Sequence, residues 1–148
     1  MRLFAAPSDC AGISESSRKM KRIGPTSAEL LGAADDLLSE ASEASAGRWP
    51  RAVAILCRQA VEGSLHDFWR AKAPGLEGAS ERAQLLCVRS YVAPELAARV
   101  EHAWTALSRA CHHHGYELSP TASELAGWFE VADELDRVVR RRIEAPSR

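Results

Sequence analysis

The sequence lacks several features that would assign it to a class at once. No run approaches the roughly 18 apolar residues that a membrane helix needs, so no membrane span is expected. The apolar run at the N-terminus is too short for a signal peptide. The four cysteines are widely scattered and form no CxxC pair, which fits reduced thiols better than disulfides or a zinc site. We therefore predict a cytoplasmic protein without a membrane segment.

An excess of charge of either sign is also missing. The 148 residues carry 19 Lys and Arg against 20 Asp and Glu, a formal net charge of −1 that gives no general sign of a nucleic-acid binder. The charge is uneven, because residues 26–47 are acidic and the C-terminus is rich in arginine. Hydrophobic residues make up 46% of the chain, which is enough for one domain with its own core.

Strands are not expected, because no segment combines strict apolar–polar alternation with β-branched residues. Residues 1–25 show no periodicity and are predicted to form a flexible tail, with Met1 and Met20 both open as the natural start. Residues 26–142 are predicted to form the helical domain, and residues 143–148 a C-terminal tail.

Helix signals divide the predicted domain into five segments. The expected starts are Thr26, Trp49, Ser80, Pro94 and Thr121. The first and last are capping boxes, in which a threonine is followed three residues later by a glutamate. We expect the first helix to run to about Ala46 and the second to end near Pro74. These signals predict an all-α, up-and-down bundle of four main helices plus a shorter one.

Two of the four tryptophans, Trp104 and Trp128, lie on or near the apolar stripes of the fourth and fifth predicted helices. Each could bury on the order of 200 Å². We assign both to packing, either in the core or between two copies of the chain.

The stretch SRACHHHGYELSP, residues 108–120, places three histidines between an arginine and a tyrosine. A metal site is not expected, because adjacent histidines on a helix point about 100° apart and do not converge on one ion. Acid–base chemistry is a second interpretation, since histidine exchanges protons near neutral pH and arginine binds phosphate oxygens. A metal-independent ribonuclease needs those groups to activate the ribose 2′-OH and stabilise the developing charge. A third interpretation, in which the histidines only cap a helix C-terminus, stays open on composition alone.

Helical geometry limits which of these side chains can act together. On an ideal helix Arg109 lies about 40° from His113 and about 140° from His114. Gly115 follows directly, and glycine commonly ends a helix, so we expect His114 in the last turn.

Arg109, His114 and Tyr116 form the pattern R-x4-H-x-Y, which resembles the signature of the HEPN superfamily. Members of that family are small helical bundles with an R-x4–6-H motif near the end of a long helix. The following tyrosine resembles the variant found in HEPN toxins that pair with minimal nucleotidyltransferase antitoxins. The predicted helix order over about residues 28–140 is similar to the family's.

The resemblance implies a homodimeric endoribonuclease that cleaves RNA without a metal or other cofactor, in a toxin–antitoxin or phage-defence setting. It implies that Arg109 holds the scissile phosphate while the two copies of His114 act as base and acid. Tyr116 would be the residue that such an antitoxin modifies. One position departs from the pattern, because the residue after the arginine is usually polar and here is Ala110. The alternative is therefore a non-catalytic HEPN-like module that binds nucleotides or proteins.

Further residues are weaker candidates. The residues predicted to support the cleft are His112, His113, Tyr116 and Glu62, although a solvated helix face explains Glu62 equally well. Arg140, Arg141 and Arg142 are candidate contacts to RNA phosphates. Their alternative role is to offset the dipole at a helix C-terminus.

Overall fold

The computed structural model describes residues 24–40, 48–112 and 118–145. Within these ranges the chain forms only helices and the segments that join them, so the predicted all-α class is confirmed. The elements are α1 (Ser27–Ser39), α2 (Trp49–Lys72), the short 3₁₀ helix η2 (Leu76–Gly78), α3 (Glu81–Val88), α4 (Pro94–Cys111) and α5 (Ala122–Glu144).

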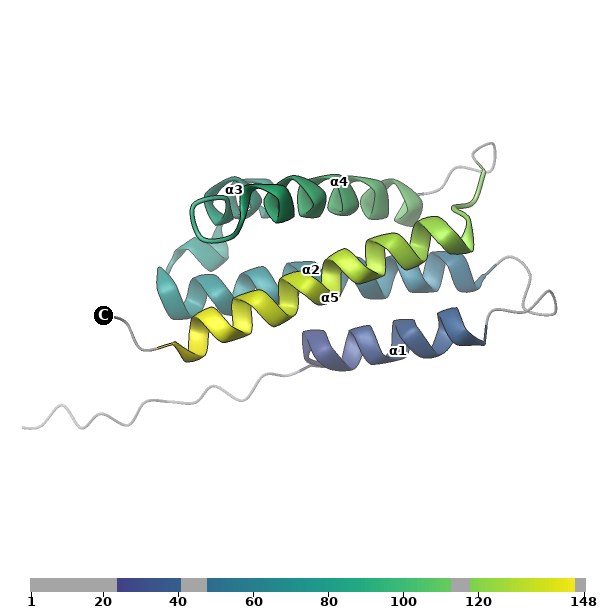
Figure 1. Cartoon of the computed structure of the whole chain (residues 1–148), viewed down its shortest axis with the longest axis horizontal. Coiled ribbons are helices and arrows are strands. Elements are labelled where there is room, and N and C mark those ends of the chain that lie inside the picture. The colour runs from purple at the N-terminus through teal and green to yellow at the C-terminus, as the bar shows by residue number, and fades with distance from the viewer. Residues whose placement is uncertain (1–23, 41–47, 113–117, 146–148) are drawn as a thin grey trace, which may run out of the picture.

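The four long helices run alternately up and down (Figure 1). Helix α2 is central and contacts α1, α3, α4 and α5. The C-terminal end of α4 lies at the same end of the bundle as the start of α5 and the start of α2 (Figure 1). No helix in the described part of the chain is both long enough and apolar enough to cross a membrane.

The helix starts follow the signals in the sequence. Both capping boxes form, with Thr26 and Glu29 at the start of α1 and Thr121 and Glu124 at the start of α5. Proline occupies the first turn of α2 and of α4, where its missing N–H costs no helical hydrogen bond. The side chain of Ser80 accepts a hydrogen bond from the Ala83 backbone N–H and caps α3.

Two helix ends differ from the expected ones. Helix α1 ends at Ser39, before the expected Ala46, and residues 41–47 lie outside the described ranges. Residues 39–47 include no large apolar side chain that could pack against α2. Helix α5 continues past residue 142 to Glu144, and Ile143 packs against the core. The predicted tail at residues 1–25 falls almost entirely outside the described ranges.

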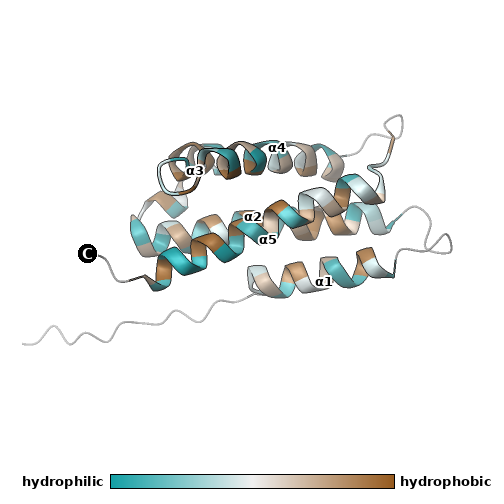
Figure 2. Ribbon diagram, in the orientation of Figure 1, coloured by the Kyte–Doolittle hydropathy of each residue, from teal (hydrophilic) through white to brown (hydrophobic). Residues whose placement is uncertain are grey.

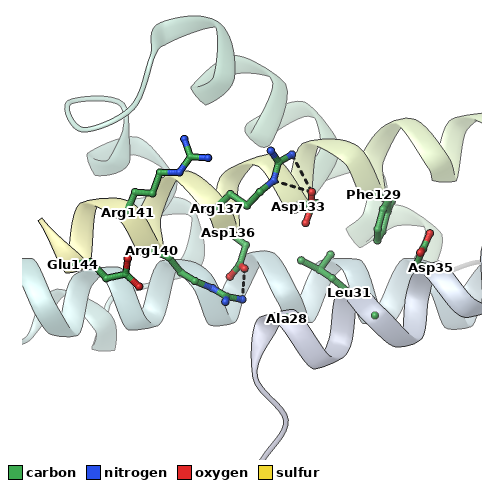
Figure 3. A pocket seen from close by; sticks show the side chains of 11 residues that line it. Ala28, Leu31, Asp35, Phe129, Asp133, Asp136, Arg137, Arg140, Arg141 and Glu144 are labelled. Carbon is green, nitrogen blue, oxygen red and sulfur yellow. Dashed lines mark hydrogen bonds and ion pairs between the residues drawn. The ribbon is translucent and has the colours of Figure 1, made fainter.

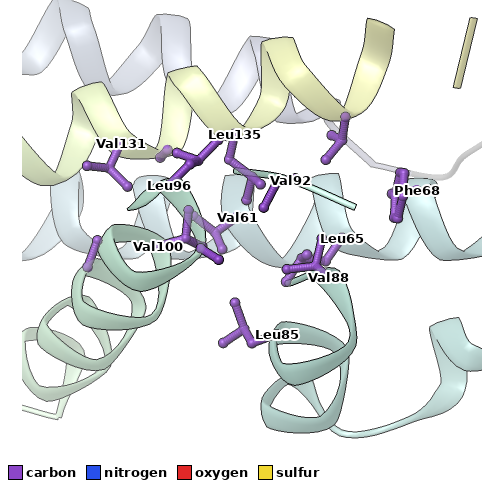
Figure 4. Close-up of a cluster of buried hydrophobic side chains, with 14 of the residues drawn as sticks. Val61, Leu65, Phe68, Leu85, Val88, Val92, Leu96, Val100, Val131 and Leu135 are labelled. Atoms are coloured by element: carbon purple, nitrogen blue, oxygen red, sulfur yellow. The ribbon is translucent and has the colours of Figure 1, made fainter. Parts of the chain in front are cut away.

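The main core lies where α2, α3, α4 and α5 meet (Figure 4). The buried rings of Phe68 and Trp69 form an edge-to-face cluster with Tyr91 at its exposed edge, with ring centroids 4.9 to 5.4 Å apart. Every helix carries both apolar and polar residues along its length, as an amphipathic bundle requires (Figure 2).

A second, smaller core lies beneath the C-terminal end of α4. Its buried members are Ala34, Val53, Ala54, Cys57, Leu107 and Leu125. They come from α1, α2, α4 and α5, so the end of α4 is held by three other helices. The residues that follow Leu107 on α4 therefore have a fixed position relative to the start of α5.

A buried polar link joins α2 to α5 near the opposite end of α5. The Ser64 hydroxyl donates a hydrogen bond of 2.8 Å to the Asp136 carboxylate, and Arg140 pairs with the other carboxylate oxygen at 2.5 Å. Ser64 is 2% exposed and Asp136 is 5% exposed. Because a buried polar group that loses its partner costs free energy, both residues depend on this link.

Replacing Asp136 with alanine is therefore expected to lower the free energy of unfolding by about 1–3 kcal/mol, since Ser64 then loses its acceptor inside the protein. Urea unfolding followed by circular dichroism measures the loss. The matched control is Asp133→Ala on the same helix, which removes an exposed pair with Arg137 and should cost about 0–1 kcal/mol. Equal losses in the two variants would contradict the structural role assigned to Asp136.

Candidate functional site

Arg109 lies in the last turn of α4, on the side of the helix that faces solvent. Ala103 and Leu107 are buried, and two further residues along an α-helix turn the side chain by about 200°. Arg109 is accordingly exposed. The packing of α4 thus presents this guanidinium at the surface, where it can meet a ligand.

His112 caps the C-terminus of α4 and is exposed. Its backbone N–H donates to the carbonyl oxygens of Arg109, at 3.0 Å, and of Ser108, at 3.3 Å. His113, His114 and Tyr116 lie outside the described residues, so the structure locates the R-x4-H-x-Y motif at Arg109 alone.

A pocket of about 390 Å³ opens between the end of α4 and the start of α5. It is lined by Arg109, Ala110, Leu118, Ser119, Pro120, Thr121, Glu124 and Trp128. The pocket was not predicted from the sequence, because Leu118 to Thr121 lie near Arg109 only through the packing of α5 against α4. The small side chain of Ala110, which departs from the family pattern, forms part of its wall.

The capping box at the start of α5 fixes one acidic group of this pocket. The Glu124 carboxylate accepts hydrogen bonds of 2.8 Å from the backbone N–H and from the hydroxyl of Thr121, both at Oε2. The backbone and side-chain hydrogen bonds from Thr121 hold the pKa of Glu124 below its ordinary value. Glu124 is therefore ionised at neutral pH and acts only as a hydrogen-bond acceptor.

Glu62 connects α2 to α4 and does not line the pocket of Arg109. Its Oε1 accepts hydrogen bonds from Arg58 Nε, at 2.8 Å, and from the indole N–H of Trp104, at 3.2 Å. The Arg58 guanidinium also lies 5.9 Å from the centroid of the Trp104 ring. Trp104 packs against the main core, as predicted. Its hydrogen bond gives Glu62 a structural partner 42 residues away.

The arginines near the end of α5 lie far from Arg109. Arg140 is paired with the buried Asp136, whereas Arg141 and Arg142 have no ion-pair partner among the described residues. Arg140 and Arg141 line a separate pocket of about 480 Å³ between α1 and α5 (Figure 3). Arg140 follows Glu124 by sixteen residues on one helix, roughly 24 Å along its axis. A single phosphate therefore cannot contact both Arg109 and this arginine group.

The described cysteines differ in their exposure and in their expected reactivity. Burial raises the pKa of Cys57 to about 12, with a smaller contribution from Cys111. Burial also raises the pKa of Cys111, and the neighbouring Arg58 opposes that rise. Cys87 is exposed on α3.

Among the three described cysteines of the folded protein, we expect iodoacetamide to modify Cys87 first and to leave Cys57 unmodified, because the thiolate is the reactive form and Cys57 is buried. Peptide mapping by mass spectrometry after a short exposure tests this order. In urea, which exposes every thiol, all cysteines should react. Modification of Cys57 in the native state at the rate of Cys87 would contradict the packing of the smaller core.

A scan against models of known families finds none that matches the chain, and searches of curated proteins and of solved structures also return no match. Among the described residues, no three histidine, cysteine, aspartate or glutamate side chains form a group that could hold a metal ion.

Proposed function

We propose that the protein is a metal-independent endoribonuclease of the HEPN type. The main support for the proposal is the position of Arg109, the first residue of the R-x4-H-x-Y pattern. Arg109 lies in the last turn of a long helix of an all-α bundle, and its exposed side chain lines a pocket. A position of this kind suits a cation that must reach a phosphate group.

In the proposed reaction a base removes the proton from the ribose 2′-OH, and the oxygen then attacks the adjacent phosphorus. An acid protonates the leaving 5′-oxygen, and Arg109 stabilises the charge that develops on the phosphate. We assign the base and acid to His114 from two copies of the chain, so the active form is a homodimer. His112 and His113 are proposed to support the cleft.

The proposed setting follows from the same resemblance. We propose that the protein acts on cytoplasmic RNA as a toxin or phage-defence effector, since scattered cysteines without a CxxC pair suit a reducing compartment. A nucleotidyltransferase-type antitoxin is the proposed protein partner, with Tyr116 as the residue that it modifies.

The test is incubation of RNA with the purified protein in excess EDTA, across the pH range around the ordinary histidine pKa of about 6.5. We expect cleavage that does not depend on added metal. Folded protein that leaves RNA intact throughout this range would overturn the proposal.

Ala110 favours a second candidate, a HEPN-like module that binds nucleotides or a protein without cleaving RNA. An apolar residue beside Arg109 removes a hydrogen-bonding group that would otherwise help to hold the phosphate. This candidate predicts saturable binding of a nucleotide or protein in the absence of any cleavage.

A further inference from the structure

The pocket beside Arg109 combines three kinds of group by which proteins bind single-stranded RNA. It contains a cation at Arg109, an aromatic ring at Trp128 and a carboxylate at Glu124. Proteins bind unpaired bases by stacking them on aromatic side chains and by hydrogen bonding to their edges, while arginine contacts the phosphate. The volume of about 390 Å³ falls in the range of small-ligand pockets.

Trp128 has different surroundings from Trp69 and Trp104, neither of which lines this pocket. Trp69 is buried in the main core, and the indole N–H of Trp104 is bonded to Glu62. Trp128 is half-buried, packs against both cores and also lines the pocket. Trp128 thus packs against the protein and also borders an open space, so it can offer a surface on which a base stacks.

Leu118 and Pro120 form the apolar side of the same pocket. Leu118 is 98% exposed, so it contributes almost no packing within this chain. A single exposed leucine is ordinary on a protein surface. This one lies in the same pocket as an arginine and a tryptophan, where it can cover the second face of a base.

We propose that this pocket binds one unpaired RNA base next to the phosphate held by Arg109, and that it prefers guanine. The position of the phosphate rests on the proposed function. The base site itself rests on Trp128, Leu118 and Glu124, and would also serve a module that binds RNA without cutting it.

The preference for guanine follows from the chemistry of Glu124. Its Oε2 accepts both hydrogen bonds from Thr121, which leaves Oε1 to accept from a ligand. Guanine presents two adjacent donors, N1–H and N2–H₂, on its Watson–Crick edge. Adenine, cytosine and uracil each have one donor group on that edge, and an acceptor lies where guanine has its second donor, so a carboxylate repels it. Ionisation of Glu124 at neutral pH strengthens this discrimination.

Binding of RNA pentamers to the His114→Ala variant tests the base site without interference from cleavage. The pentamers are uridine-rich, carry a fluorescent label, and have guanine, adenine, cytosine or uridine at the central position. By fluorescence anisotropy, we expect the guanine pentamer to bind about tenfold more tightly than the others. Glu124→Gln should remove most of this preference, and it should keep the helix cap because glutamine also forms capping boxes.

Two further changes test the stacking surfaces in the same background. Leu118→Ala should weaken binding of the guanine pentamer several-fold without affecting folding, because Leu118 is almost fully exposed. The matched control is Leu86→Ala on α3, another exposed leucine outside this pocket, which should bind as tightly as the parent. Trp128→Leu should weaken binding, and Trp128→Phe should retain most of it.

Equal binding of all four pentamers, or guanine binding unaffected by Leu118→Ala and Glu124→Gln, would overturn the base site. Failure of every pentamer to bind would overturn it as well, even if the wild type cleaves RNA. Guanine-selective binding together with an inactive wild type would support the base site and reject the nuclease. The cleavage assay and the binding assay thus test the two proposals separately.

Discussion

Replacing His114 with alanine is expected to lower the rate of RNA cleavage by about 10²- to 10⁴-fold, the contribution that a positioned acid or base makes to catalysis. Arg109→Ala is expected to lower it by about 10²- to 10³-fold, because the developing charge on the phosphate then loses its cation. Initial rates on a labelled RNA in excess EDTA measure both effects. Arg109→Lys should recover only part of the activity, since lysine keeps the charge but loses the planar fork.

The matched control for these variants is His102→Ala. His102 is an exposed histidine on the same helix, seven residues before Arg109 and outside its pocket. Its replacement should leave the cleavage rate unchanged. Circular dichroism should show that all four variants are folded. A His114→Ala variant that cleaves RNA at the wild-type rate would contradict the catalytic role assigned to His114.

The largest expected effect on stability comes from Phe68. This side chain is 0% exposed, and its ring makes edge-to-face contacts with Trp69 and Tyr91. Phe68→Ala should lower the free energy of unfolding by about 3–5 kcal/mol, because the cavity left in the main core cannot fully close. Urea unfolding monitored by circular dichroism measures the change.

Leu86→Ala provides the control for Phe68, because it also shortens an apolar side chain but at a site that is 51% exposed. It should change the free energy of unfolding by less than about 0.5 kcal/mol. A loss below about 1 kcal/mol in Phe68→Ala would mean that the main core is not packed as described.

The starts of the helices could be predicted because they depend on neighbouring residues. The capping boxes at Thr26 and Thr121 each lie within four residues of sequence, and both form. The expected end of α1 near Ala46, just before Gly47, was wrong. The helix ends at Ser39, directly after Leu38, its last large apolar residue, which agrees with a helix held mainly by tertiary packing.

The surroundings of the candidate site depend on contacts between distant residues. The exposed position of Arg109 agrees with the apolar spacing on α4, which buries Ala103 and Leu107. The partner of Glu62 is Trp104, on another helix, and the partner of Ser64 is Asp136, 72 residues away. Such pairs carry no local signal in one sequence, since only the packing of α2 against α4 and α5 brings them together.

The most direct test of the proposed mechanism is cleavage in EDTA of two RNAs that differ in one oxygen atom. After the cleavage site is mapped, one substrate keeps the ribose at that position and the other carries a single 2′-deoxy sugar. We expect a 2′,3′-cyclic phosphate and a 5′-hydroxyl from the first substrate and no cleavage at that position of the second, because the 2′-OH is the proposed nucleophile. Cleavage of both substrates at equal rates, or intact RNA with folded protein, would contradict it.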